Sequence, residues 1–435
     1  MQKFKSKQKN NMFTVNVIAV IFMFALAFAR FMSPGIDAVI GPILTVLMLF
    51  LAFSGYAEMV IALIIVANDA LGTMLFGSLS FPYLLILIVL LKLLMRRSLT
   101  VDSFVVISLI LIVDAFVAGD VDTRHVLYSV LFILALSIID EKRNGIKLFY
   151  RGVAISVFII ALHACLTGGV EFVDVEKMEY ARKGILGVGI GDPNYSAYLL
   201  IVGMVCTWFD SSFNRIVKII FSAVMVYALT VTASISGIIA LCITVVGSLY
   251  VNNKNKFKFL IVTTIVIAVV ALAFFVYIDL PQEQHNKLLD TYVERITEKI
   301  AVFESGDLNK ATTGRVNHLS FYLDYIINNQ SISAFLFGGN SMFVSGRVAH
   351  NTFIGIVLQI GFVGFLAFIL VILIRLFESL RTIKYSINAK RASVLVLLSI
   401  IMSFSLSFYQ GGLWALYMYF LLHKEKFVLE KSSLA

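Results

Sequence analysis

Arg315, Arg347 and His350 are the residues of this chain whose types and spacing favour chemistry on a phosphate group. They fall within one long polar segment, residues 281–351, which lies between two strongly apolar stretches. A guanidinium binds two phosphate oxygens at once and stays charged, whereas an imidazole exchanges a proton near neutral pH. This set predicts a lipid-pyrophosphate site in which arginines hold the anion and His350 takes the proton of an attacking hydroxyl.

Two amphipathic stretches of the polar segment are expected to position these side chains. Residues 286–304 and 315–328 repeat apolar residues at helical spacing, which predicts two helices lying along a membrane surface. Arg315 and His318 stand near the start of the second helix, where the N-terminal amides also favour an anion. The segment therefore predicts a roof of interfacial helices over the ends of the apolar spans, with a basic underside.

The composition predicts a polytopic membrane protein. Hydrophobic residues make up 60% of the 435 residues and charged residues only 14%, whereas about a quarter of a soluble domain is charged. The net charge of +9 does not indicate a nucleic-acid partner, because lysine and arginine stand in short runs between apolar segments. The three cysteines lack metal-binding spacing, so we expect packing roles for them and no metal.

About fourteen apolar stretches are candidate membrane spans. They are 13–30, 36–53, 59–76, 82–95, 101–118, 126–139, 149–167, 194–209, 216–231, 235–250, 259–279, 352–374, 393–409 and 412–422. Lysine and arginine collect in alternate connections, which predicts a cytoplasmic location for those connections and for both termini. The first stretch resembles a signal peptide, but an uncleaved span keeps the even count, so we favour that interpretation.

The expected fold class is an all-α, polytopic transmembrane helix bundle with a large extracytoplasmic loop. Residues 1–280 would carry the spans up to 259–279 and an outer loop at 168–193. Residues 281–351 would form the extracytoplasmic catalytic loop, and residues 352–435 the C-terminal transmembrane helices and a cytoplasmic tail. We expect the protein in the cytoplasmic membrane, with membrane lipids around it.

The order of several short motifs resembles the O-antigen polymerase and O-antigen ligase superfamily of integral membrane glycosyltransferases, the Wzy and WaaL type. The likeness covers roughly residues 180–375. Its strongest stretches are Thr313-Gly314-Arg315, Phe337-Gly338-Gly339-Asn340, Ala349-His350-Asn351-Thr352-Phe353 and Gln359-Ile360-Gly361-Phe362-Val363-Gly364, preceded by Arg182-Lys183-Gly184 and Gly191-Asp192-Pro193-Asn194. A third family segment corresponds to Thr232–Gly237, where Ile235 stands in place of the family's arginine.

The resemblance implies a metal-independent glycosyltransferase without a cofactor. Its donor would be a polyprenyl-pyrophosphate-linked oligosaccharide, and its acceptor a sugar hydroxyl on the outer face of the membrane. It assigns Arg315 and His350 to catalysis, and implies substrate-binding positions at Arg182, Arg347, Asn351, Asn194 and His318. Asn351 would either fix the imidazole or cap the following span. Flippase and chain-length regulator proteins are candidate partners.

Several alternatives stay open at this point. A polymerase of capsule or exopolysaccharide repeat units is favoured, and a ligase differs from it only in the acceptor. A lipid-oligosaccharide flippase is the alternative of another class, for which Asp69 and Asp114 inside predicted spans would be the useful residues. A purely structural role is the last alternative, in which Arg315 pairs with Asp307 and His350 is an ordinary interfacial histidine.

Overall fold

The computed structural model describes about three quarters of the chain in separate stretches. These are residues 2–33, 37–71, 81–96, 101–139, 144–168, 170–173, 181–184, 193–232, 234–253, 315–328, 330–341, 343–344, 347–348, 351–384, 386–406 and 412–424, with single positions at 261, 264, 297 and 301. His350, and all but single positions of the predicted span 259–279 and the predicted surface helix 286–304, lie outside these residues.

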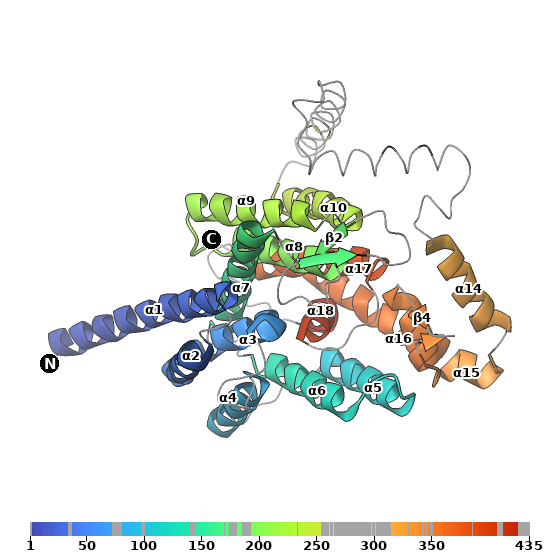
Figure 1. The fold of residues 1–435 in the computed structure, drawn as a ribbon, viewed down its shortest axis with the longest axis horizontal. Coiled ribbons are helices and arrows are strands. Elements are labelled where there is room, and N and C mark those ends of the chain that lie inside the picture. The colour runs from blue at the N-terminus through green and yellow to red at the C-terminus, as the bar shows by residue number, and fades with distance from the viewer. Residues whose placement is uncertain are drawn as a thin grey trace.

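The described chain is a bundle of apolar helices with two small antiparallel hairpins (Figure 1). The helices before the first hairpin are α1 (Gln2–Met32), α2 (Asp37–Leu51), α3 (Ala57–Leu71), α4 (Phe81–Arg96), α5 (Ser103–Val117), α6 (Thr123–Ser137) and α7 (Gly145–Thr167). The first hairpin is β1 (Val170–Val173) with β2 (Ala181–Gly184), followed by α8 (Pro193–Phe209), α9 (Arg215–Val231) and α10 (Ile235–Asn252). The later elements are α14 (Arg315–Asn328), α15 (Ile332–Phe337), β3 (Phe343–Val344), β4 (Arg347–Val348), α16 (Thr352–Thr382), α17 (Ile387–Ser403) and α18 (Gly412–Leu422).

Five helical stretches of the described residues are long and apolar enough to cross a membrane. They are Val15–Met32, Val39–Ala67, Gly145–Thr167, Ile235–Asn252 and Thr352–Thr382, and shorter apolar helices accompany them. An all-helical fold is therefore confirmed, and its long apolar helices fit a membrane protein. The total of about fourteen spans and the location of both termini stay predictions.

Side-chain caps explain why several helices begin where the hydropathy pattern predicts. Asn214 accepts the backbone N–H of Val217 at the start of α9, and Ser234 accepts that of Gly237 at the start of α10. Each cap satisfies an amide that the first helical turn leaves without an internal partner. Local sequence thus fixes these helix starts.

The predicted loop between spans 36–53 and 59–76 is a helical corner. Residues Ala52–Tyr56 continue the helix in a wider, π-type turn, and Gly55 alone leaves helical geometry with φ 92° and ψ 12°. Because glycine adopts positive φ without steric cost, the chain changes direction there while its neighbours keep their helical hydrogen bonds. The two predicted spans therefore join in one bent helical unit, in which α2 and α3 point in different directions (Figure 1).

Helix α18 lies in the middle of the bundle, with α3, α5, α6, α16 and α17 packed around it (Figure 1). Every residue from Leu413 to Leu422 is buried, including Trp414 and Tyr417. Eleven residues make a helix of about 16 Å, roughly half of the hydrocarbon thickness. The predicted span 412–422 therefore has the expected bounds, but it is an interior helix rather than a lipid-facing one.

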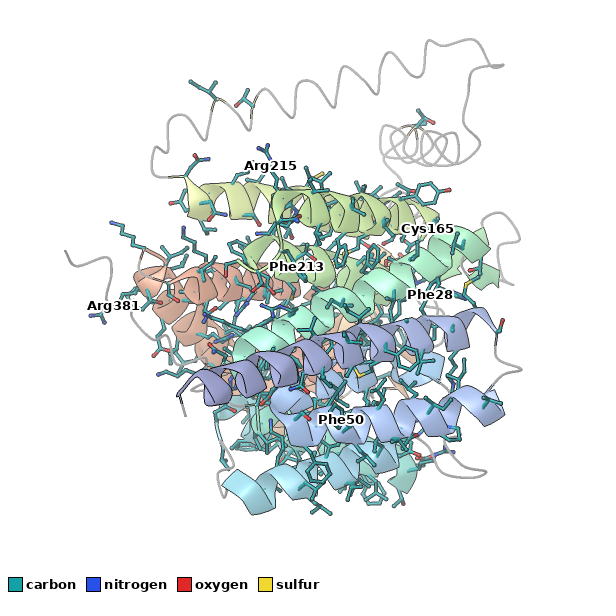
Figure 2. All side chains as sticks on the ribbon, turned by 90° about the vertical axis from the view of Figure 1, so that its left-hand side faces the viewer. Phe28, Phe50, Cys165, Phe213, Arg215 and Arg381 are labelled. Atoms are coloured by element: carbon teal, nitrogen blue, oxygen red, sulfur yellow. The ribbon has the colours of Figure 1, made fainter. Side chains whose placement is uncertain are left out.

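Side chains fill the spaces between the helices, as Figure 2 shows for the face formed by α1, α2 and α7. One large apolar core runs through most of these helices, and its members include Trp414 and the fully buried Tyr150, Tyr198 and Phe149. In the same view Arg381 lies at one end of the bundle and Cys165 toward the other. The bundle is thus one packed body with two distinct ends.

Candidate functional site

A cluster of polar side chains joins the first turns of α8 and α10. The hydroxyls of Ser234 and Ser236 donate to Oδ1 of Asn194, at 2.9 and 2.8 Å. Asn194 is only 9% exposed. We call Asn194, Ser234 and Ser236 the Asn194 cluster. Its amide oxygen is used within the protein, which makes Asn194 a residue that holds two helix ends together.

Gly237 allows this approach of α10 to α8. A side chain on Gly237 would overlap Cβ of Ala197, so a residue larger than glycine would push the two helices apart. Ser234 caps the same helix turn through the N–H of Gly237. The Ser-x-Ser-Gly pattern at 234–237 is therefore built for close helix contact, even though Ile235 stands where a cation was expected.

Arg182 lies on β2, whose partner strand is β1. Phe172 is the residue opposite Arg182 in this antiparallel pair, and β2 contacts α8. The backbone on both sides of Arg182 is therefore paired with the neighbouring strand. The structure thus brings the strand of Arg182 to the helix that carries Asn194.

The polar segment after residue 314 forms a small folded unit, α14, α15 and the β3–β4 hairpin, which we call the roof. Arg315 is the first residue of α14, and Arg347 lies on β4 opposite Val344. Tyr322 and Ile326 of α14 pack with Val344 and with Leu358 of α16 in a second apolar core. The predicted helix 315–328 is confirmed with the expected bounds. Figure 1 shows the roof beside the first turns of α16.

Glycines at the end of α15 and in α16 allow these two helices to contact each other through their backbones. Gly361 has φ 69° and ψ −179°, which interrupts the helix and frees the carbonyl of Gln359 to accept the N–H of Gly339 at 2.7 Å. Gly338 has φ 79°, and a side chain there would overlap the Gln359 carbonyl. The glycine pair Gly338-Gly339 is therefore a docking point, because only glycine allows the two backbones to approach this closely.

A second tie joins the roof to the turn between α5 and α6. The hydroxyl of Ser341 donates to Oδ1 of Asp120, a residue 221 positions away in the sequence. Asn340 adds a backbone hydrogen bond from its N–H to the carbonyl of Leu358. The roof is therefore fixed at two separate points.

Asn351 caps α16. Its Oδ1 accepts the backbone N–H groups of Phe353 and Ile354, at 2.9 and 3.3 Å. Of the two roles that the sequence left open, the cap is the one the structure shows. The residue before it, His350, lies outside the described residues, and so do the side chains of Arg182, Arg315, His318 and Arg347.

A chain of hydroxyl groups connects the Asn194 cluster with the start of α16. Tyr198, one turn after Asn194, shares a hydrogen bond of 2.9 Å with Ser399 of α17. Ser403, one turn further along α17, contacts the hydroxyl of Tyr417 and donates to the carbonyl of Ser399. The hydroxyl of Thr352 donates to the carbonyl of Leu406 and lies near that of Tyr417. We call these five residues the hydroxyl chain (Tyr198, Ser399, Ser403, Tyr417, Thr352).

The structure therefore gathers the predicted residues in two groups. Arg182 and Asn194 belong to the α8 group, whereas the elements of Arg315, His318, Arg347 and Asn351 belong to the roof and α16. Helix α17 packs against both α8 and α16 and bridges the groups. Sequence reasoning missed the hydroxyl chain, because serines and tyrosines inside apolar spans show no spacing that separates them from ordinary core residues.

No set of three or more metal-binding side chains lies together in the described part of the chain. Searches for similar proteins gave no match: no family model fits the chain, and no curated protein or solved structure is detectably similar to it. The functional assignment therefore depends on the residues and their geometry.

Proposed function

We propose that this protein is a polysaccharide polymerase that joins polyprenyl-pyrophosphate-linked oligosaccharide repeat units on the outer face of the cytoplasmic membrane. The observation that carries the proposal is the docking of the roof on α16. It sets the helix opened by Arg315 and the strand of Arg347 against the helix that begins directly after His350 and Asn351. The elements that carry Arg315 and Arg347 thereby lie beside the start of the helix that follows His350 in the sequence.

The proposed reaction uses these residues for charge stabilisation and proton transfer. The oxygen of the acceptor hydroxyl bonds to the anomeric carbon of the donor glycan, and the bond from that carbon to the pyrophosphate oxygen breaks. The lipid pyrophosphate leaves with the electron pair, and Arg315 and Arg182 stabilise its charge. His350 takes the hydroxyl proton. Pyrophosphate is a good leaving group, so positioning and electrostatics supply most of the catalysis.

Contacts between distant segments support the predicted topology, which places this site outside. Contacts between residues far apart in the sequence join residues that the pattern of lysines and arginines assigns to the same side of the membrane. Arg151 pairs with Asp210, and Lys424 with Glu378, on the predicted cytoplasmic side. Ser341 pairs with Asp120 on the outer side. If one span between two contacting residues were miscounted, the prediction would place the two residues on opposite sides of the membrane.

The test is a reconstituted reaction in detergent or proteoliposomes with a synthetic lipid-pyrophosphate-linked repeat unit. Wild-type protein should release lipid pyrophosphate and lengthen the glycan, whereas Arg315→Ala and His350→Ala should lose at least a hundredfold of this rate, as expected for loss of a positioned acid–base or charge-stabilising group. The matched control is Arg381→Ala on the last turn of α16, which changes the same type of residue at the other end of that helix and should keep full activity.

Two other outcomes have definite meanings. Transfer of one glycan to a different acceptor, without lengthening, would identify a ligase that uses the same site. Transport of labelled lipid-linked oligosaccharide across the bilayer without any turnover would exclude the enzyme and indicate a flippase.

A further inference from the structure

Three polar groups near the roof tip have no hydrogen-bond partner among the residues that the structure describes. They are Nδ2 of Asn340, both amide atoms of Gln359, and Oδ2 of Asp114, and the atoms are all shielded from solvent. Gln359 has no exposed surface at all. A buried polar atom without a partner loses its hydrogen bonds to water and gains nothing in return, so such groups require an explanation.

These groups lie on elements that the structure holds together. Gln359 and Asn340 are neighbours, because the N–H groups of Gly339 and Asn340 bond to the carbonyls of Gln359 and Leu358. Ser341, the next residue, binds Asp120. The carboxylate of Asp120 is close enough to act electrostatically on Asp114, and α5, which carries Asp114, packs against α16. The roof tip, the break in α16 and the end of α5 thus form one junction.

The local structure does not use these side chains to hold itself together. The docking of the roof is made by backbone groups of Gly339 and Asn340, and by Ser341. The break in α16 arises from the backbone of Gly361. An apolar residue at position 359 would satisfy the same backbone geometry and would not leave an amide without a partner. The amide therefore has a role other than packing.

We propose that Gln359, Asn340 and Asp114 form a carbohydrate subsite that binds hydroxyl groups of a sugar residue of the glycan. The chemistry fits this ligand: a carboxylate oxygen accepts, the Asn340 amide nitrogen donates, and the Gln359 amide does both. Each hydroxyl of a sugar can both donate and accept a hydrogen bond. A site with donors and acceptors therefore satisfies the sugar hydroxyls and its own polar groups. The inference rests on the proposed function, since it places the sugar beside the segment that leads into His350 and Asn351.

The experiment measures sugar binding without any turnover. The probe is the free oligosaccharide released by mild acid from the lipid-linked pool of cells that carry the gene. It is titrated into the full-length protein in detergent by ligand-observed NMR. Gln359→Leu should weaken binding at least tenfold and leave the melting temperature unchanged or raised, because the variant removes a buried amide without a partner. Asn340→Ala, on the roof surface, should weaken binding in the same direction.

The control is Asn16→Leu, which removes another buried amide whose Oδ1 has no partner, on α1. It should leave sugar binding unchanged. The proposal is overturned if wild type does not bind the oligosaccharide, or if Gln359→Leu and Asn340→Ala bind it as wild type does, which would assign the polar groups to trapped water. If sugar binding depends on Gln359 but the protein lengthens no glycan, the proposal of a sugar subsite stands and the proposed polymerase function is rejected.

Discussion

The charged pairs at one end of the bundle contrast with a junction at the other end, where two amides keep polar atoms without a partner. At the predicted cytoplasmic end, charged side chains pair with each other: Arg151 with Asp210, Lys92 with Glu58, and Lys424 with Glu378. At the predicted outer end, the junction of the roof with α16 leaves Asn340 and Gln359 with polar atoms that have no partner in the described structure. Pairing stabilises a fold, whereas a polar group kept without a partner lowers stability and is available to a ligand.

Other charged side chains at the predicted cytoplasmic end also contact groups of the protein. Arg391 is 2% exposed, stands 3.4 Å over the ring of Tyr150 and donates to Asn388. Asp102 accepts the backbone N–H of Val105 and lies 2.7 Å from Nδ1 of His423. Substitutions at this end should therefore change stability without changing activity per folded molecule, whereas substitutions at the outer junction should change activity as well.

The largest expected effect on stability is at the buried pair of Lys92 and Glu58, 2.5 Å apart and almost without exposure. Lys92→Met should destabilise the protein by about 3–5 kcal/mol, because it leaves a buried carboxylate without its cation. The double variant Glu58→Leu with Lys92→Met should recover most of that loss. Thermal unfolding in detergent measures both. Equal loss in the single and double variants would show that the pair does not act as a unit.

The next effect concerns the docking of the roof. Gly338→Ala should cost about 2–3 kcal/mol locally, because it combines strain at φ 79° with overlap of a backbone carbonyl. Glycan lengthening should fall more than tenfold, and limited proteolysis should cut within 315–348. Gly339→Ala is the matched control: it has φ 86° but open space around its Cβ position, so it should show strain alone, about 1 kcal/mol. Identical behaviour of the two variants would refute tight docking.

A smaller effect is expected from the hydroxyl chain. Tyr417→Phe should destabilise the protein by about 1–2 kcal/mol, since Ser403 loses a buried partner. Tyr419→Phe changes an equally buried tyrosine of the same helix, whose ring packs on Phe104 and His423 and whose hydroxyl lies outside the hydroxyl chain. It should change stability by less than about 0.5 kcal/mol. Unfolding midpoints of the two variants, compared side by side, test whether the chain of hydroxyls matters.

The smallest effect is a pH dependence at Asp210. Burial raises the pKa of this carboxyl, but hydrogen bonds from Arg151 and Ser212 outweigh it and hold the pKa below the ordinary value of 3.8. A lowered folded-state pKa contributes stability that is complete above the unfolded value and is lost as pH falls through the folded one. Stability from this pair should thus be constant above about pH 5 and decline below pH 4. The difference in melting temperature between wild type and Asp210→Asn should shrink over that acid range; a constant difference would contradict the assignment.

Much of the secondary structure could be predicted from the sequence, because helix starts and ends depend on residues that are close together in the chain. The bounds of α14, α18 and α8 follow from apolar periodicity and Pro193, which act within a few residues. The corner at Gly55 was missed because a single glycine within apolar sequence predicts a weak helix position and gives no sign of whether the helix ends or bends.

For the candidate site, too, some features can be read from the sequence and others depend on how the helices pack. Sequence by itself determined the membrane class, the polar segment with its arginines and histidine, and the order of the short motifs. Only the tertiary structure decided that Ser234 and Ser236 bind Asn194, that Ser341 reaches Asp120, and that α18 lies inside the bundle. The physical reason is that helix formation depends on neighbours in the chain. Partners 40 to 221 residues apart are set by how the helices pack.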